Sequence, residues 1–150
     1  MRILIDTNIL ARLAQPAHPH HPGTVRAIEA LRGNGDELCV VPQVIYEYWV
    51  VCTRPPGENG LGMTTAETRT ETAQIKRLFT LFRDERAIFP VWEDLVTSYE
   101  VKGKNAHDAR LVAAMSRHGL KHLLTFNAPD FSRYSGITVF TPDQVLRASP

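Results

Sequence analysis

Short apolar runs that alternate with amphipathic stretches predict an α/β protein with a mainly parallel central sheet of about five strands. The runs are three to five residues long, as expected for strands buried on both faces. The stretches between them repeat apolar residues at helical spacing, so helices should cover the sheet as an α/β/α sandwich. At 150 residues and 43% hydrophobic composition, we expect one domain over residues 1–150.

The first half of the chain alternates strand and helix. Ile3–Ile5 is the first expected strand, and the periodic stretch Thr24–Arg32 is a helix. Leu38–Val41 is the second strand, and Pro42–Cys52 follows it as a helix with a proline at its start. A proline- and glycine-rich loop then separates this helix from the centre of the chain.

The second half repeats this alternation. Ala73–Arg83 is an expected helix, and Thr64 with Glu67 can form a capping box before it. The expected strands are Ala87–Val91, His122–Thr125 and Ile137–Phe140, and the helices between them are Glu93–Val101 and Ala106–His118. Asn105 suits the N-cap of the last helix, and Gly119 suits its end.

Composition excludes several classes of protein. The net charge is +1, so the overall charge does not indicate a nucleic-acid or membrane partner. A polyanion would have to bind a local basic patch. The first apolar run is too short for a signal peptide or a membrane span, which indicates a cytosolic protein without a membrane partner. Cys39 and Cys52 lie in apolar segments without CxxC spacing, so we expect buried free thiols.

Three carboxylates occur where charge is costly. Asp6 ends the first apolar run, Glu47 interrupts an apolar helix, and Asp108 lies on the apolar face of the last long helix. Acids are seldom buried without positive charge beside them. Few Lys or Arg residues are available in these segments, so a divalent metal is the natural candidate.

The expected fold brings these acids to one edge of the sheet. Asp6 follows a strand, Asp108 begins a helix, and Asn127 and Asp130 follow the strand that ends at Thr125. In parallel sheets, sites form outside the carboxyl ends of the strands. A set of oxygen ligands without cysteine suits Mg²⁺ or Mn²⁺ rather than zinc. The leading reaction class is metal-assisted hydrolysis of a phosphodiester by water.

Four segments resemble, in order and spacing, the motifs of PIN-domain ribonucleases: Ile3–Leu10, Pro42–Trp49, Ala106–Leu111 and Leu124–Phe131. Chain size and motif order look most like the VapC-type toxins of type II toxin-antitoxin systems. The resemblance implies a PIN-like fold, endoribonuclease activity on RNA with Mg²⁺ or Mn²⁺, a cognate antitoxin protein, and a homodimer formed through helical faces.

The resemblance also implies roles for individual residues. Asp6, Glu47 and Asp108 would be the catalytic, metal-binding acids, and Asn8 and Thr125 would support them through their side-chain oxygens. Many members of the family carry a fourth acid where this chain has Asn127. Either the amide oxygen of Asn127 or the nearby carboxylate of Asp130 would then complete the metal site, which we expect to hold one ion in the absence of RNA.

Structural explanations compete for each acid. Asp6 could cap the helix that follows it, Asp108 could be a first-turn acid favoured by the helix dipole, and Glu47 could pair with Arg54. The side chains that could contact RNA are Lys102, Lys104, Arg110, Arg133, Tyr48 and Trp49. The basic ones are equally compatible with surface solvation, and the aromatic ones with a core or a subunit interface.

Two alternative functions remain open. One is a catalytically silent PIN-like module for RNA binding or regulation, suggested by Asn127 in the usual acidic position. The other is a phosphatase of the haloacid-dehalogenase kind, whose first strand also ends in an aspartate. That pattern normally has a second aspartate where this chain has Asn8.

Overall fold

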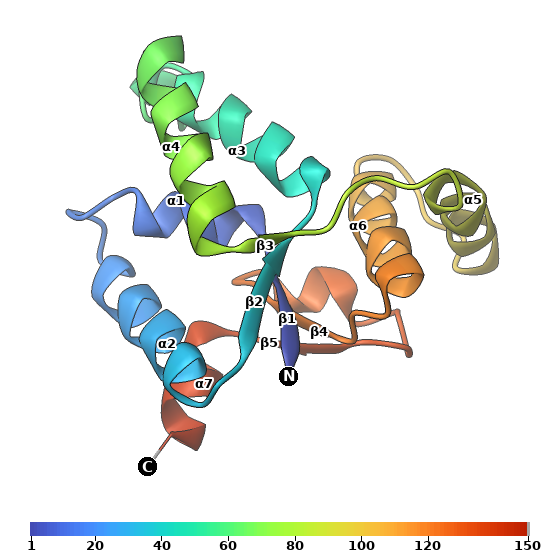
Figure 1. The fold of residues 1–150 in the computed structure, drawn as a ribbon. Helices are drawn as coiled ribbons and strands as arrows, with labels where there is room; N and C mark the ends of the chain where they lie inside the picture. Colours follow the sequence, from blue (N-terminus) through green and yellow to red (C-terminus); the bar gives the residue numbers. More distant parts are fainter. Residues whose placement is uncertain (150) are drawn as a thin grey trace.

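Five parallel strands form one sheet in the computed structural model, which describes residues 1–149 (Figure 1). The strand order is β3-β2-β1-β4-β5. The strands are β1 Arg2–Ile5, β2 Glu37–Val40, β3 Thr80–Leu81, β4 His122–Leu124 and β5 Thr138–Phe140. The predicted α/β fold with a parallel five-stranded sheet is therefore confirmed, and only Pro150 of the expected domain lies outside the described residues.

Helices cover both faces of this sheet. In Figure 1, α1, α2 and α7 lie on one side, and α5 and α6 lie on the other, while α3 and α4 pack together as a hairpin. The helices are α1 Thr7–Leu13, α2 His21–Gly33, α3 Pro42–Thr53, α4 Thr65–Leu78, α5 Ile88–Ser98, α6 Asn105–His118 and α7 Pro142–Ala148, with short 3₁₀ turns η1 Pro56–Glu58 and η2 Ala128–Phe131.

The core follows the two central strands. Ile3, Leu4 and Ile5 of β1 and Leu123 and Leu124 of β4 are fully buried. Burial on both faces explains why these strands read as unbroken apolar runs in the sequence. The free thiols of Cys39 and Cys52 are buried, as predicted.

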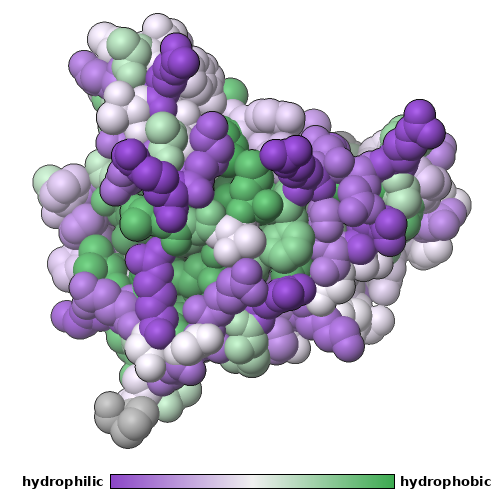
Figure 2. All heavy atoms as spheres, viewed as in Figure 1, coloured by the Kyte–Doolittle hydropathy of each residue, from purple (hydrophilic) through white to green (hydrophobic). Residues whose placement is uncertain are grey.

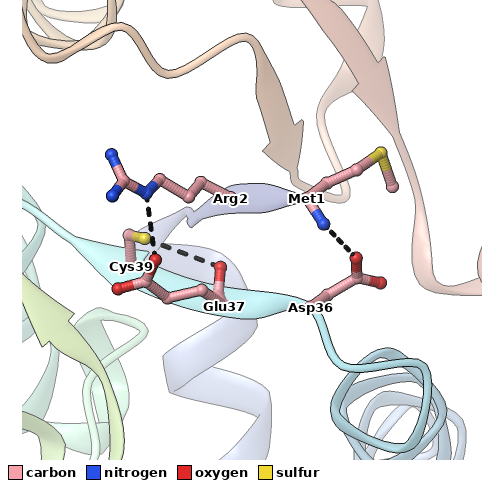
Figure 3. A network of polar contacts seen from close by, with 5 residues as sticks. All are labelled: Met1, Arg2, Asp36, Glu37 and Cys39. Atoms are coloured by element: carbon pink, nitrogen blue, oxygen red, sulfur yellow. Dashed lines mark hydrogen bonds and ion pairs between the residues drawn. The ribbon is translucent and has the colours of Figure 1, made fainter.

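Polar contacts join the start of β1 to β2, at the end of the sheet where both strands begin (Figure 3). The amino group of Met1 lies 2.6 Å from the Asp36 carboxylate, and Arg2 donates to Glu37 over 3.0 Å. The Cys39 thiol donates to the Glu37 carbonyl. Exposed ion pairs such as Arg2–Glu37 contribute little stability, so the register of the sheet rests on burial of its apolar residues.

One predicted strand is wrong. Ala87–Val91 forms the start of α5, and the third strand is Thr80–Leu81, within the segment predicted to continue the preceding helix. A five-residue apolar run cannot be distinguished from a buried helical turn by periodicity alone. Ile88, Val91 and Leu95 recur at helical spacing and pack toward the core, and α5 lies against α6.

Helix boundaries also differ from the prediction. The helix expected over Ala73–Arg83 begins at Thr65 and ends at Leu78. The bounds of α1 and α7 were not predicted, because these helices are too short to show a clear period of apolar residues. Asn105 is the first helical residue of α6 rather than its cap. Gly119 does end α6 in the left-handed region at φ 68°, and the Thr64 hydroxyl accepts from the Glu67 amide. None of the helices within residues 1–149 has the length and apolarity needed to cross a membrane.

Candidate active site

Asp6 and Thr125 meet because β1 and β4 pair in parallel. Ile5 lies opposite Leu124, so the next residues of both strands emerge side by side at the carboxyl edge of the sheet. The Thr125 hydroxyl donates to Asp6 Oδ2 over 2.7 Å, and the Thr7 amide donates to Asp6 Oδ1 over the same distance. Asp6 therefore does cap α1, and it also has a second role in a polar cluster.

The surroundings of Asp6 raise the pKa of its carboxyl. Burial raises its pKa most strongly, and the negative charges of Glu47 and Asp130 raise it further. The hydrogen bonds from Thr125 and Thr7 act in the opposite direction, since they stabilise the charged form. Capping alone does not explain the neighbouring acids.

Glu47 reaches the same cluster from α3. Its Oε2 accepts from the Thr7 hydroxyl over 2.9 Å, and its Oε1 accepts from the Gln43 amide over 3.0 Å. The proposed partner Arg54 instead donates to the carbonyl of Asn59. Among residues 1–149, no Lys or Arg forms an ion pair with Glu47, so its charge is left without a basic partner.

Asp108 lies in the first turn of α6, as predicted from the sequence. Burial, followed by repulsion from Asp6, Asp130 and Glu47, raises the pKa of its carboxyl to about 6. Its carboxylate accepts no hydrogen bond from any side chain or amide within the described residues. A first-turn acid that served only the helix dipole would have a lowered pKa, so the dipole explanation does not account for Asp108.

The segment after β4 supplies the remaining candidates. Asp130 lies in η2 and is exposed, yet its charge acts on both Asp6 and Asp108. Asn127 precedes η2 and donates its backbone amide to the Thr125 hydroxyl, while its side chain is exposed. The fold thus gathers the negative charges of Asp6, Glu47, Asp108 and Asp130.

Asn8 supports the cluster differently from the expectation. Its side-chain oxygen accepts from the backbone amide of Phe126 over 3.1 Å. Its amide nitrogen donates to the Thr125 hydroxyl over 3.0 Å and to Asp6 Oδ2 over 3.4 Å. Asn8 therefore ties α1 to the end of β4.

Gln43, like Thr7, belongs to the cluster around Glu47 and was not predicted from the sequence. Its amide nitrogen donates to Glu47 Oε1 and to the His107 carbonyl, and its oxygen accepts from Arg110 over 3.2 Å. The side chain is buried and connects α3, which carries Glu47, to α6, which carries Asp108. Its position one turn before Glu47 on the same helical face was the available signal.

The donor set suits a hard divalent cation. All candidate ligands are oxygens, the acids repel one another, and none of the ion pairs within residues 1–149 neutralises them. In the described part of the chain, no three Asp, Glu, His or Cys side chains enclose a metal-sized site as they stand. Mg²⁺ keeps several waters when it binds carboxylates, so water would fill much of its coordination shell.

The raised pKa of Asp108 predicts the pH dependence of stability without metal. The folded protein holds this proton more tightly than the unfolded chain. Protonated Asp108 therefore adds fully to the free energy of unfolding below about pH 4, and this stabilisation is lost as pH rises through about 6. The shift corresponds to about 1–2 kcal/mol after allowance for solvent screening. We expect the stability difference between Asp108→Asn and wild type, measured by denaturant unfolding in EDTA, to grow in favour of the variant between about pH 5 and about pH 7.5. A pH-independent difference would contradict the raised pKa of Asp108.

Comparison with known proteins agrees with this geometry. The sequence model of the PIN domain family matches residues 3–137. No curated protein matches the chain in sequence. Similar solved structures include VapBC2 from Rickettsia felis bound to a promoter DNA fragment, with a TM-score of 0.69 and 14% identity over 94% of this chain and 98% of that one.

Two further structures show the same fold. A toxin-antitoxin complex from Klebsiella pneumoniae has a TM-score of 0.65 and 23% identity, covering 93% of this chain and 97% of that one. VapC20 from Mycobacterium tuberculosis, a Sarcin-Ricin loop cleaving toxin, has a TM-score of 0.64 and 18% identity, covering 91% and 96%. At these identities the likeness establishes the fold, while the family match covers nearly the whole chain. The chain belongs to the PIN-domain family.

Proposed function

We propose that this chain is a divalent-metal-dependent endoribonuclease and the toxin of a toxin-antitoxin pair. The observation that supports it most directly is the convergence of four acids without a basic partner at the carboxyl edge of the sheet. Membership of the PIN-domain family favours a nuclease over the haloacid-dehalogenase alternative. RNA as the substrate is drawn from VapC20, which cleaves the Sarcin-Ricin loop.

In this proposal Asp6, Glu47 and Asp108 hold Mg²⁺ or Mn²⁺, with Asp130 or Asn127 completing the set. When bound, such an ion lowers the pKa of water and offsets the charge of a phosphodiester. Thr125 and Asn8 orient Asp6, and Thr7 and Gln43 orient Glu47, through the hydrogen bonds described above.

Asp108 is the best candidate to accept a proton from the attacking water. Its carboxylate oxygens accept no hydrogen bond within residues 1–149, so they are free to face a substrate. One of these oxygens can therefore face the attacking water while the other holds the ion. Asp6, by contrast, already accepts a hydrogen bond on each of its oxygens.

An antitoxin and a second copy of the chain are the proposed protein partners. The Klebsiella pneumoniae structure is a toxin-antitoxin complex with the same fold. For the homodimer we favour the outer face of α3, where Tyr46, Trp49 and Val50 repeat at helical spacing and are 62%, 36% and 51% exposed. Tyr48, on the opposite face, fills the core. If this face is the dimer interface, Tyr46→Glu should shift sedimentation toward the monomer.

The experiment that tests the nuclease is incubation of the purified protein with labelled structured RNA in Mg²⁺, Mn²⁺ or EDTA, beside an Asp6→Asn, Asp108→Asn double variant. Discrete cuts that need metal and vanish in the variant are the expected result. Binding without cleavage in either metal, from folded protein and across several RNAs, would instead favour the silent module.

A further inference from the structure

The first turns of α5 carry two neighbouring aromatic rings, of which Phe89 is exposed and Trp92 packs partly against the core. Phe89 is 62% exposed, and its ring lies 5.9 Å from that of Trp92 with an interplanar angle of 26°. The Trp92 indole donates to the carbonyl of Ala106 over 2.8 Å, which fixes its position against α6. An exposed ring supported by an immobilised one is a preformed stacking surface.

These rings line a cavity of about 400 Å³ between α5 and α6. The cavity is lined by Glu85, Arg86, Ile88, Phe89, Trp92 and Arg110. Figure 2 shows a mainly hydrophilic surface with small hydrophobic areas on the side of the molecule where α6 lies in Figure 1. The cavity is therefore an open surface feature with both aromatic and charged walls.

The charges around this cavity leave an excess of positive charge. Glu85 pairs with Arg117 over 2.5 Å, and Arg110 pairs with Asp84 over 3.3 Å. Within residues 1–149, Arg86 forms no ion pair. An arginine without a carboxylate partner beside aromatic rings is the combination that single-stranded nucleic acids meet on proteins, since the rings stack on bases and the cation attracts phosphate.

Two side chains connect this cavity to the acids. Arg110, which lines the cavity, donates to Gln43 over 3.2 Å, and Gln43 donates to Glu47 over 3.0 Å. These two hydrogen bonds place the wall of the cavity next to the acid cluster.

We propose that this cavity binds an unpaired nucleobase of single-stranded RNA adjacent to the cleaved phosphate, with the base stacked on Phe89 and a phosphate contacted by Arg86. The proposal rests on the nuclease function proposed above, for which it defines a substrate subsite. An apolar protein side chain would occupy the rings but would leave Arg86 unmatched, whereas a nucleotide supplies a base for the rings and a phosphate for the arginine. Bases within a duplex stack on one another and are not available to the rings.

The test uses Trp92 as its own reporter. The chain has two tryptophans, so Trp49→Phe leaves Trp92 as the only one, and EDTA prevents metal-dependent cleavage. We expect an unstructured RNA oligonucleotide to quench Trp92 fluorescence, and a duplex of the same sequence to quench it much less. In this background Phe89→Ala should weaken binding about 5- to 100-fold, as loss of one stacking contact does.

Matched variants distinguish a stacking contact of the Phe89 ring from a general apolar contact of its side chain. Phe89→Tyr should bind as wild type, whereas Phe89→Leu should bind as weakly as Phe89→Ala. Arg86→Gln should weaken binding and reduce its salt dependence. Leu78→Ala, at an exposed apolar position on α4, should have no effect.

The measurements distinguish an error in the proposed base-binding subsite from an error in the proposed nuclease activity. If the wild type cuts RNA and Phe89→Ala leaves both binding and KM unchanged, the subsite is overturned and the nuclease stands. If the wild type never cuts RNA, yet quenching and its loss in Phe89→Ala persist, the subsite stands and the nuclease falls. A change of sedimentation in Phe89→Ala with unchanged RNA binding would assign the rings to a protein interface and overturn the subsite.

Discussion

Replacing Asp108 with Asn is expected to reduce metal-dependent RNA cleavage by about 10²-fold or more, while the protein remains folded. The variant removes the charge and the candidate proton acceptor without breaking any hydrogen bond that the Asp108 side chain makes within residues 1–149. It also relieves repulsion with Asp6, Asp130 and Glu47, so the metal-free protein should unfold at equal or higher denaturant concentration at neutral pH. Single-turnover cleavage and unfolding in EDTA measure the two effects.

Asp143→Asn is the matched control for this variant. Asp143 also lies in the first turn of a helix, α7, its side chain is exposed, and it is not among the charges that act on Asp6 or Asp108. It should retain full cleavage activity. If Asp108→Asn cleaved as well as Asp143→Asn, Asp108 would be an ordinary first-turn acid and the assigned site would be wrong.

The second large effect is expected for Thr125→Val, which keeps the shape of a fully buried side chain and removes its hydroxyl. That hydroxyl donates to Asp6 and accepts from the Asn8 amide and the Asn127 backbone. Its loss removes one hydrogen-bond partner from each of these groups, which should cost about 1–3 kcal/mol of unfolding free energy. Because Asp6 also loses its orientation, affinity for Mn²⁺ should fall by about 10- to 100-fold.

Two variants control for this result. Thr125→Ser keeps the hydroxyl and should retain most of the Mn²⁺ affinity measured by titration calorimetry. Thr68→Val removes an equally buried hydroxyl that donates only to the Thr64 carbonyl of its own helix, so it should leave metal affinity unchanged. If Thr125→Val lowered stability but bound Mn²⁺ as tightly as wild type, the hydroxyl would serve the fold alone.

The fold could be predicted wherever local pattern and burial agree. β1, β2 and β4 are buried on both faces, so each appears as an apolar run and was predicted within a residue or so. Thr80–Leu81 escaped prediction because two residues carry no period, and they become a strand only through pairing with Cys39 and Val40. Ala87–Val91 was assigned to the wrong class because its apolar residues serve packing against α6 rather than the sheet.

The sequence by itself determined the acids of the candidate site, because a carboxylate in an apolar segment is costly and therefore conspicuous. It identified Asp6, Glu47 and Asp108 without any three-dimensional information. Only the tertiary structure decided how these acids are held and what surrounds them. The contacts of Thr125 with Asp6 and of Arg110 with Gln43 join residues 119 and 67 positions apart. Such distant pairs are brought together by the strand order and by the packing of α3, α5 and α6, and neither leaves a local pattern in the sequence.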